Sequence, residues 1–259
     1  MSRDLHVIAC VENAANAALV IPWARHFAER LNHKGLIALH VEARRGDDSW
    51  LQELGVPYIS LQGEWSTAID GLPTAFGGIL AVTAVDPKAP RTSLTHPHTL
   101  LQQFKGCKIA YLVVSKPFSA LHSPLSALTM THHREGKEKL VWASYLARFL
   151  NSTIAIAHPD YRDAGLRGRW RNNMRFADKM FDPFGIHYTT PIITRQTRVD
   201  LATLDELRPD LLIARTTDQR ERDLFDLLSP RPELRLLTHP SHTPLLFLNP
   251  RDDLYIICD

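Results

Sequence analysis

The sequence has few of the residues that mark secreted, membrane-spanning or nucleic-acid-binding proteins. Only three cysteines occur in 259 residues, Cys10, Cys107 and Cys258, and their wide spacing argues against a disulfide framework or a cysteine-based zinc site. No apolar run reaches the roughly 20 residues that cross a bilayer, and the polar start MSRDLH is unlike a signal peptide. A net charge of +2 gives no field to recruit nucleic acid or anionic lipid. We therefore expect a cytoplasmic chain with no nucleic acid partner and no direct membrane insertion.

Motifs for catalysis are missing as well. The sequence contains no G-x-S-x-G elbow, Walker A loop, H-E-x-x-H pair or G-x-G-x-x-G fingerprint. Aspartates and histidines are plentiful, but no recognisable spacing joins a pair of them to a nucleophile. The sequence therefore predicts no catalytic residue and a protein that is not an enzyme.

The clearest pattern in the chain lies between Ala127 and Pro159. Residues 127–131 suit a strand, residues 137–150 carry a broad apolar stripe at helical spacing, and residues 153–157 are a short apolar run. Parallel strands need a crossover connection, which is usually a helix. The stretch therefore predicts a strand–helix–strand unit.

The same unit occurs near the start of the chain. Trp23 falls on Trp142 with a shift of 119, which predicts that both are equivalent core positions. Four further identities share this shift: Ala24, Ala28, Leu31 and Asn32 fall on Ala143, Ala147, Leu150 and Asn151. A repeat of this size indicates a duplicated α/β domain.

The rest of the sequence extends this plan to two full halves. We expect an α/β fold of two tandem doubly wound domains, each with a mostly parallel five-stranded sheet flanked by helices. The predicted domains are residues 1–118, with a reduced second helix, and residues 127–259, joined by a linker at 119–126. The second half is expected to contain a long helix within residues 162–184. Strands at 127–131, 186–193, 211–214 and 245–248, helices at 201–207 and 218–228, and a further strand at 254–258 are also predicted.

The repeat WA…A..LN between strands and the closing pattern PDLLIARTTD…LTHPSHTPLLFLNP resemble the universal stress protein family in its tandem form. The resemblance covers nearly the whole chain. It implies a cytoplasmic protein with a stress-response or regulatory role, whose two repeats pair through their fifth strands. It also leaves open a homodimer and a protein partner such as a membrane transporter, since such domains occur with cation/proton antiporters.

Members of this family that bind ATP carry glycines spaced G-x2-G-x9-G-[ST] after strand four. Phosphate oxygens must approach backbone N–H groups there, and a side chain would block them. No glycine follows Gly185 in this chain, and the corresponding first-half segment has only Gly106 near its end. The family's acidic residue at the end of strand one, which contacts the nucleoside, corresponds to Glu12 in one half and Thr131 in the other. The resemblance therefore implies a degenerate nucleotide-binding site and no cofactor, with ATP or another nucleotide as the alternative.

Histidines gather where doubly wound sheets bind ligands, at the carboxyl ends of strands. His132, His133 and His158 have this position in the second half, and His40 has the related position in the first. Imidazoles there could coordinate a metal or contact a phosphate. Because no further ligands cluster beside them in the sequence, we expect no metal site and interpret them as ligand-binding candidates or loop residues.

Arg215, Thr216 and Thr217 follow strand four of the second half, and they are the best remaining place for an anion. Thr217 or Asp218 could instead cap the next helix. The sequence thus favours a non-enzymatic tandem universal stress-like protein that acts through protein contacts or a small anionic ligand. A nucleotide sensor using Glu12, His132, Arg215 and Thr216 is the alternative, and a phosphate or acyl hydrolase is the weaker one.

Overall fold

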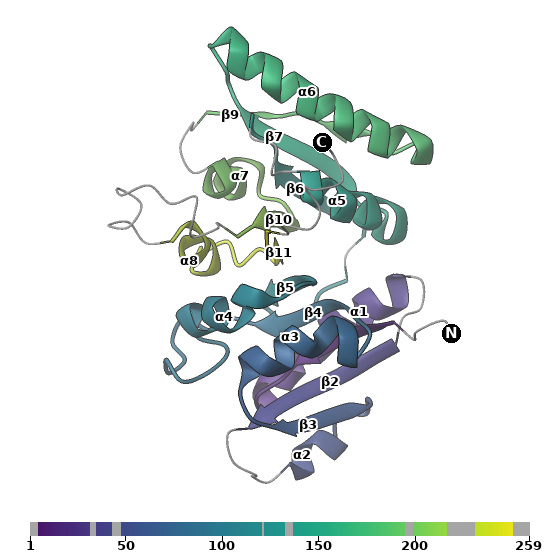
Figure 1. Cartoon of the computed structure of the whole chain (residues 1–259), viewed down its shortest axis with the longest axis vertical. Coiled ribbons are helices and arrows are strands. Elements are labelled where there is room, and N and C mark those ends of the chain that lie inside the picture. The colour runs from purple at the N-terminus through teal and green to yellow at the C-terminus, as the bar shows by residue number, and fades with distance from the viewer. Residues whose placement is uncertain are drawn as a thin grey trace.

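The computed structural model describes residues 5–31, 35–42, 48–120, 122–132, 137–194, 199–216 and 231–250. In this part of the chain, an eleven-stranded sheet runs through both halves and carries helices on its two faces (Figure 1). The first half contains β1 (His6–Cys10), α1 (Ala14–Arg30), β2 (Gly35–Glu42), α2 (Ser49–Gln52), β3 (Tyr58–Gln62), α3 (Trp65–Ala75), β4 (Gly78–Ala84), α4 (Pro97–Gln103), η1 (Phe104–Gly106) and β5 (Ala110–Val114).

The second half repeats this order with one longer helix. Its elements are β6 (Leu125–Thr129), α5 (Lys137–Leu150), β7 (Thr153–Pro159), α6 (Ala164–Phe181), η3 (Asp182–Phe184), β8 (Tyr188–Thr189), β9 (Ile192–Ile193), α7 (Val199–Leu207), β10 (Leu211–Arg215), α8 (Pro232–Leu237) and β11 (Leu245–Leu248). None of the described helices is long and apolar enough to cross a membrane.

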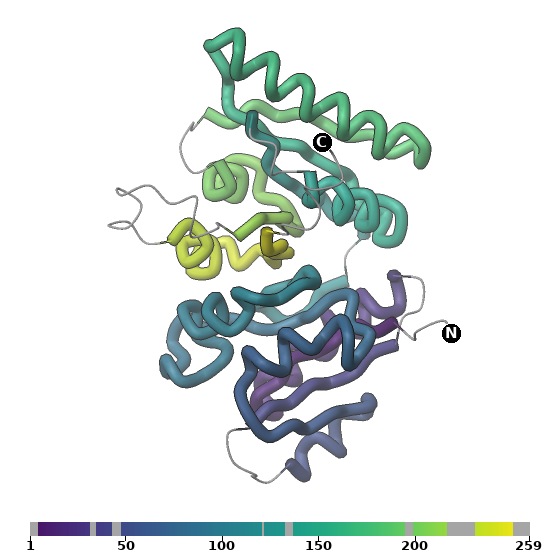
Figure 2. Tube along the Cα trace, viewed as in Figure 1, coloured from purple at the N-terminus to yellow at the C-terminus, as the bar shows by residue number. Residues whose placement is uncertain are grey.

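The strand order is the same in both halves. It reads β3-β2-β1-β4-β5 in the first and β8-β7-β6-β10-β11 in the second, with β9 beside β7. All pairs within a half are parallel, and the halves join through an antiparallel pair of β5 and β11, with Leu112 opposite Leu246. The expected α/β class with doubly wound, mostly parallel sheets is confirmed, and the fifth strands pair as the family resemblance implied. Figure 2 shows the two halves stacked along the long axis, with this pair between them.

Two apolar layers hold the helices against the sheet. The side chains of α1, α5 and α6 pack on one face, whereas those of α3, α4, α7 and α8 pack on the other. The aromatic rings of Tyr111 and Phe247 stack across the junction of the halves with centroids 5.5 Å apart. Asn249 donates to the carbonyls of Phe104 and Cys107 at 2.7 and 2.9 Å. The junction is therefore held by aromatic packing and by partly buried hydrogen bonds, as well as by the strand pair.

Several predicted boundaries were wrong. The strand expected at 127–131 is β6, and it begins at Leu125, where pairing with Thr153 starts directly after Pro124. The strand expected at 186–193 is two short strands, since Pro191 between them has no N–H for a sheet ladder. Helix α8 was not predicted. The segments expected at 218–228 and 254–258 lie outside the described residues.

The two equivalent tryptophans differ in burial. Trp23 is 3% exposed, and its indole N–H donates to the carbonyl of Lys116 at 3.0 Å. Trp142 packs against the same apolar layer but is only half-buried, with its ring edge-on to Tyr145. Both tryptophans lie on the helix that follows the first strand of their half. The expectation that both are core positions was wrong for Trp142, because its helix leaves part of the ring in solvent.

Candidate functional site

Glu12 follows β1 at the carboxyl edge of the sheet, but its carboxylate is bound within the protein. One oxygen accepts from the Ser93 hydroxyl at 2.5 Å and the other from the Leu94 backbone N–H at 2.6 Å. Ser93 and Leu94 belong to the segment between β4 and α4. Both carboxylate oxygens of Glu12 are therefore hydrogen-bonded to the segment between β4 and α4.

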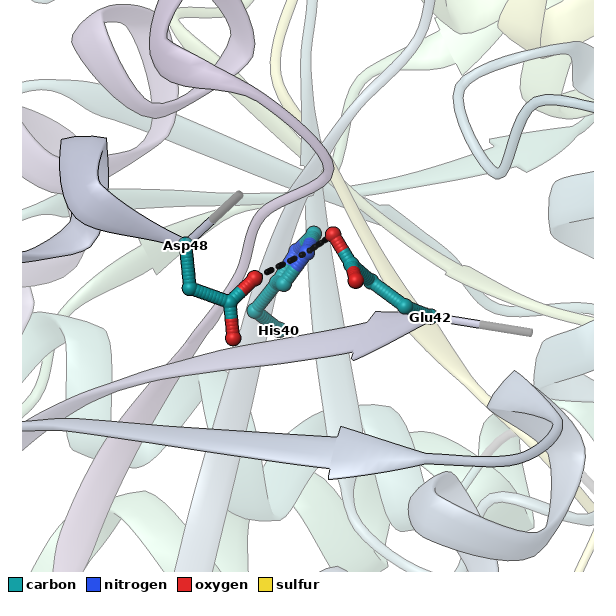
Figure 3. A group of neighbouring side chains, drawn as sticks. All are labelled: His40, Glu42 and Asp48. Carbon is teal, nitrogen blue, oxygen red and sulfur yellow. Dashed lines mark hydrogen bonds and ion pairs between the residues drawn. The ribbon is translucent and has the colours of Figure 1, made fainter. Parts of the chain in front are cut away.

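His40, near the end of β2, meets two carboxylates. Its Nε2 lies 2.8 Å from Glu42 Oε1 and 3.8 Å from Asp48 Oδ1, and its Nδ1 lies 2.8 Å from the carbonyl oxygen of Val11 (Figure 3). His40 and Glu42 are two residues apart on one strand and therefore share a face. Asp48 is the residue that directly precedes α2. Sequence reasoning singled out His40 but missed both acids. Asp48 lies six residues after Glu42 in the sequence, and no recognisable spacing joins the two carboxylates to the histidine.

The carboxyl edge of the second half-sheet has a buried lysine, Lys139, whereas the same edge of the first half has the carboxylates of Glu12 and Glu42. Lys139 of α5 donates to the Thr129 hydroxyl at 2.8 Å, and this hydroxyl donates to Asp200 of α7 at 2.5 Å. Burial lowers the pKa of Lys139, Asp200 counters that shift, and Arg215 at the end of β10 adds to it. Two cations and one anion therefore meet at the ends of β6 and β10. Sequence reasoning found Arg215 here but not Lys139, whose position on the helix reads as an ordinary exposed lysine.

The other second-half candidates have local partners. Asn173 donates to the Thr131 carbonyl at 2.9 Å, and the backbone N–H of His132 donates to the Tyr161 hydroxyl at 3.0 Å. His158 is buried with its ring against Trp170, at 4.1 Å between centroids. These contacts hold the ends of β6 and β7 in place.

Thr216 is the last described residue of the segment expected to hold an anion. Its hydroxyl donates to Asn249 Oδ1 at 2.6 Å, which ties the end of β10 to the end of β11. Thr217 and His133, the remaining sequence candidates, lie outside the described residues. The charge of Arg215 thus acts on the pKa of Lys139, whereas the Thr216 hydroxyl is bonded to Asn249 beside the junction of the halves.

A cavity of about 400 Å³ lies where α4 of the first half meets α8 of the second. Its lining combines two arginines, two histidines and smaller side chains, and no residue among those that line it is acidic. These residues are Pro87, Arg91, His96, Pro97, His98, Leu234, Arg235 and Thr238. Arg91 comes from the segment after β4 and Arg235 from α8, so each half contributes one permanent positive charge.

The two histidines of this cavity, His96 and His98, lie close to each other and to positive charges. Their rings stack at 5.6 Å between centroids. Desolvation lowers the pKa of His98 below its ordinary value, and the nearby charges of Arg91, His96 and Arg231 lower it further. His96 Nδ1 is buried and has no hydrogen-bond partner within the described residues. Sequence reasoning did not find this cavity, because only folding brings Arg235 from far along the chain to His96 and His98.

No family model matches the sequence, and no curated protein matches it. Solved structures do resemble it over nearly their whole length. A Pseudomonas aeruginosa UCBPP-PA14 protein assigned to the universal stress proteins has a TM-score of 0.62 at 16% identity, with 98% of this chain and 96% of that chain covered.

Two more solved structures agree with this likeness. A functionally unknown protein from Pseudomonas aeruginosa PAO1 has a TM-score of 0.59 at 16% identity, with 98% and 95% covered. A universal stress protein from Archaeoglobus fulgidus DSM 4304 has a TM-score of 0.56 at 10% identity, with 95% and 97% covered. At these identities the likeness is one of fold, and this chain has the fold of the universal stress proteins over its full described length.

Proposed function

We propose that this chain is a stress-related protein of the universal stress type that acts without catalysis, by binding a small anion in the cavity between α4 and α8. The observation that carries the proposal is the lining of that cavity, with Arg91 and Arg235 facing one space together with His96 and His98. A guanidinium keeps its charge at every physiological pH and presents several N–H donors to phosphate or sulfate oxygens.

The size and position of the cavity support a small-molecule ligand with a regulatory effect. A volume of about 400 Å³ falls within the range of small-molecule sites. Because Arg91 and Arg235 belong to different halves, one bound anion would bridge them and relieve the repulsion among the cavity's cations. The bound anion would stabilise the junction by mass action. Protein partners in the cytoplasm would then bind the anion-bound and the anion-free forms with different affinity.

A nucleotide at the family's usual position is disfavoured by the contacts of Glu12. Its carboxylate already accepts two hydrogen bonds from Ser93 and Leu94. Hydrogen bonds to a charged group contribute about 1.5–3 kcal/mol each, so a nucleoside that displaced Ser93 and Leu94 would have to compensate for the loss of both. The lack of glycines in the adjoining segments removes the close backbone approach that phosphates require.

Calorimetric titration of the full chain with sulfate, phosphate, AMP, ATP and cyclic nucleotides tests the proposal. We expect sulfate and phosphate to bind with one site per chain, and Arg91→Gln and Arg235→Gln each to weaken binding by about 10-fold, one lost charge-assisted contact. Arg171→Gln removes an exposed arginine of α6 and should leave the affinity unchanged.

Three outcomes would overturn the proposal. They are equal anion affinity in Arg91→Gln, Arg235→Gln and the parent chain, ATP binding that is tight and insensitive to both substitutions, and steady turnover of ATP or an acyl ester. Tight ATP binding would favour the nucleotide sensor, and turnover would favour a hydrolase.

A further inference from the structure

The group formed by His40, Glu42 and Asp48 shares no residue with the lining of the anion cavity, and it contains two carboxylates whereas that lining contains none. One nitrogen or oxygen atom from each residue falls within 4.8 Å of the other two. Figure 3 shows the two carboxylates on either side of the imidazole ring. Two acids and one imidazole around a common point are a donor set for a cation.

The His40 ring is fixed in the orientation that a ligand needs. The side chain is 4% exposed. A backbone carbonyl can only accept a hydrogen bond, so Nδ1 donates to Val11 O at 2.8 Å, and Nε2 is the atom turned toward the carboxylates. Metal-binding histidines are held by such a hydrogen bond from the nitrogen away from the metal. Trp50 packs edge-on against the same ring, at 5.2 Å between centroids, and limits its rotation.

Asp48 is held as firmly from its other side. Ser60 of β3 stands directly opposite His40 in the strand register, and its hydroxyl donates to Asp48 Oδ2 at 2.5 Å. Asp48 Oδ1 is shielded from solvent, and among the described residues it accepts no hydrogen bond. A shielded carboxylate oxygen without a donor carries a desolvation penalty. The carboxylate is not used to cap α2 either. A cation beside Oδ1 would offset that penalty.

We propose that His40 Nε2, Glu42 and Asp48 bind a divalent transition-metal ion of the zinc type. Zinc bonds of about 2.0–2.2 Å to nitrogen and oxygen place tetrahedral ligand atoms about 3.4 Å apart. The separations of 2.8 and 3.8 Å from Nε2 bracket this value, so the ion enters with small rotations of the two acids. An imidazole donor favours zinc or a similar ion over calcium or magnesium, which prefer oxygen alone. Three protein ligands leave one position for water or an anion.

The second half contains a natural control for this site. Asp160 follows His158 by the same two residues that separate Glu42 from His40. There the imidazole stacks on Trp170, and the strand residue opposite it is Ile192 in place of a serine. Among the described residues, no third ligand and no orienting hydroxyl joins His158 and Asp160, so substitutions at Asp160 should not affect the ion.

Calorimetric titration of the full chain with ZnCl₂ tests the proposal. We expect one saturable zinc ion per chain, and Glu42→Gln and Asp48→Asn each to weaken binding by at least about 100-fold, since each removes a ligand. Ser60→Ala, which only releases Asp48, should weaken it by about 10-fold. Asp160→Asn should bind as the parent chain does. Circular dichroism and thermal melting establish that each variant is folded.

Anomalous diffraction at the zinc edge from soaked crystals locates the ion independently of variant stability. A peak between His40 and Asp48 supports the proposal. A zinc affinity equal in Glu42→Gln, Asp48→Asn and the parent chain, a peak elsewhere only, or no saturable binding would overturn it. None of these residues lines the anion cavity, so the two proposals fail separately.

Discussion

The carboxyl edges of the two half-sheets share one strand order and differ in the charged side chains that they carry. In the first half, Glu42 and Asp48 lie beside the His40 imidazole. Glu12 is hydrogen-bonded to the loop before α4. In the second half the matching edge carries Lys139 and Arg215 against Asp200. Strand order and pairing are the same in both. The difference shows that the apolar layers determine the fold, while the polar residues at the strand ends can change without altering it.

The two tryptophans give the largest contrast. Trp23→Ala should lower the free energy of unfolding by roughly 3–5 kcal/mol, since it empties a buried site and removes a hydrogen bond. Trp142→Ala should cost about half as much or less, because its ring is partly in solvent already. Urea unfolding of both variants measures the difference. Equal losses would show that the two half-domains use this position in the same way.

Asp200→Ala tests the buried charge of the second half. Removing the carboxylate leaves Lys139 buried without its counter-charge, which should cost about 3 kcal/mol at neutral pH. Burial lowers the pKa of Lys139, so the folded state binds fewer protons than the unfolded state just below the ordinary lysine value. Stability should then recover as the pH rises toward that value. A loss that is independent of pH would contradict the assignment, and Lys139→Met in the same background should restore stability.

Glu12→Ala tests the contact of the Glu12 carboxylate with the loop before α4 in the first half. The variant loses the acceptors for Ser93 and Leu94, and unfolding free energy should fall by about 2 kcal/mol. Hydrogen exchange at Leu94 should speed up in parallel. Thr131→Ala is the matched change in the second half and should cost less, since Thr131 offers no carboxylate. An unchanged exchange rate at Leu94 in Glu12→Ala would show that the loop is held by other groups.

The smallest effect concerns the pH dependence of anion binding. Desolvation and the nearby cations hold the pKa of His98 below its ordinary value, so the ring takes up its proton at a lower pH than a free histidine does. Sulfate keeps a constant charge over this range, and its affinity should rise several-fold between pH 7.5 and pH 5.5, roughly one added charge–charge contact. Calorimetry at both values with the parent chain and His98→Gln isolates this residue. A pH response that persists in His98→Gln would assign it to another group.

The elements of the fold could be predicted because apolar periodicity is local. The limits of α5 and β11 agree with the sequence pattern to the residue. Helix α8 was missed since it is short and begins at a proline, which reads as a loop. The candidate sites were recovered only in part. His40 and Arg215 follow strand ends and could be found, whereas Asp48, Lys139 and Arg235 reach their places through tertiary packing, which no spacing in the sequence records.

A crystal structure of the full chain grown with both sulfate and ATP tests the central claim that the family's nucleotide position has been closed and an anion site lies between the halves. We predict sulfate, or a phosphate group, between Arg91 and Arg235, with the Glu12 contacts to Ser93 and Leu94 intact. An adenosine seated at Glu12, with those contacts broken and the cavity between α4 and α8 empty, would contradict the account.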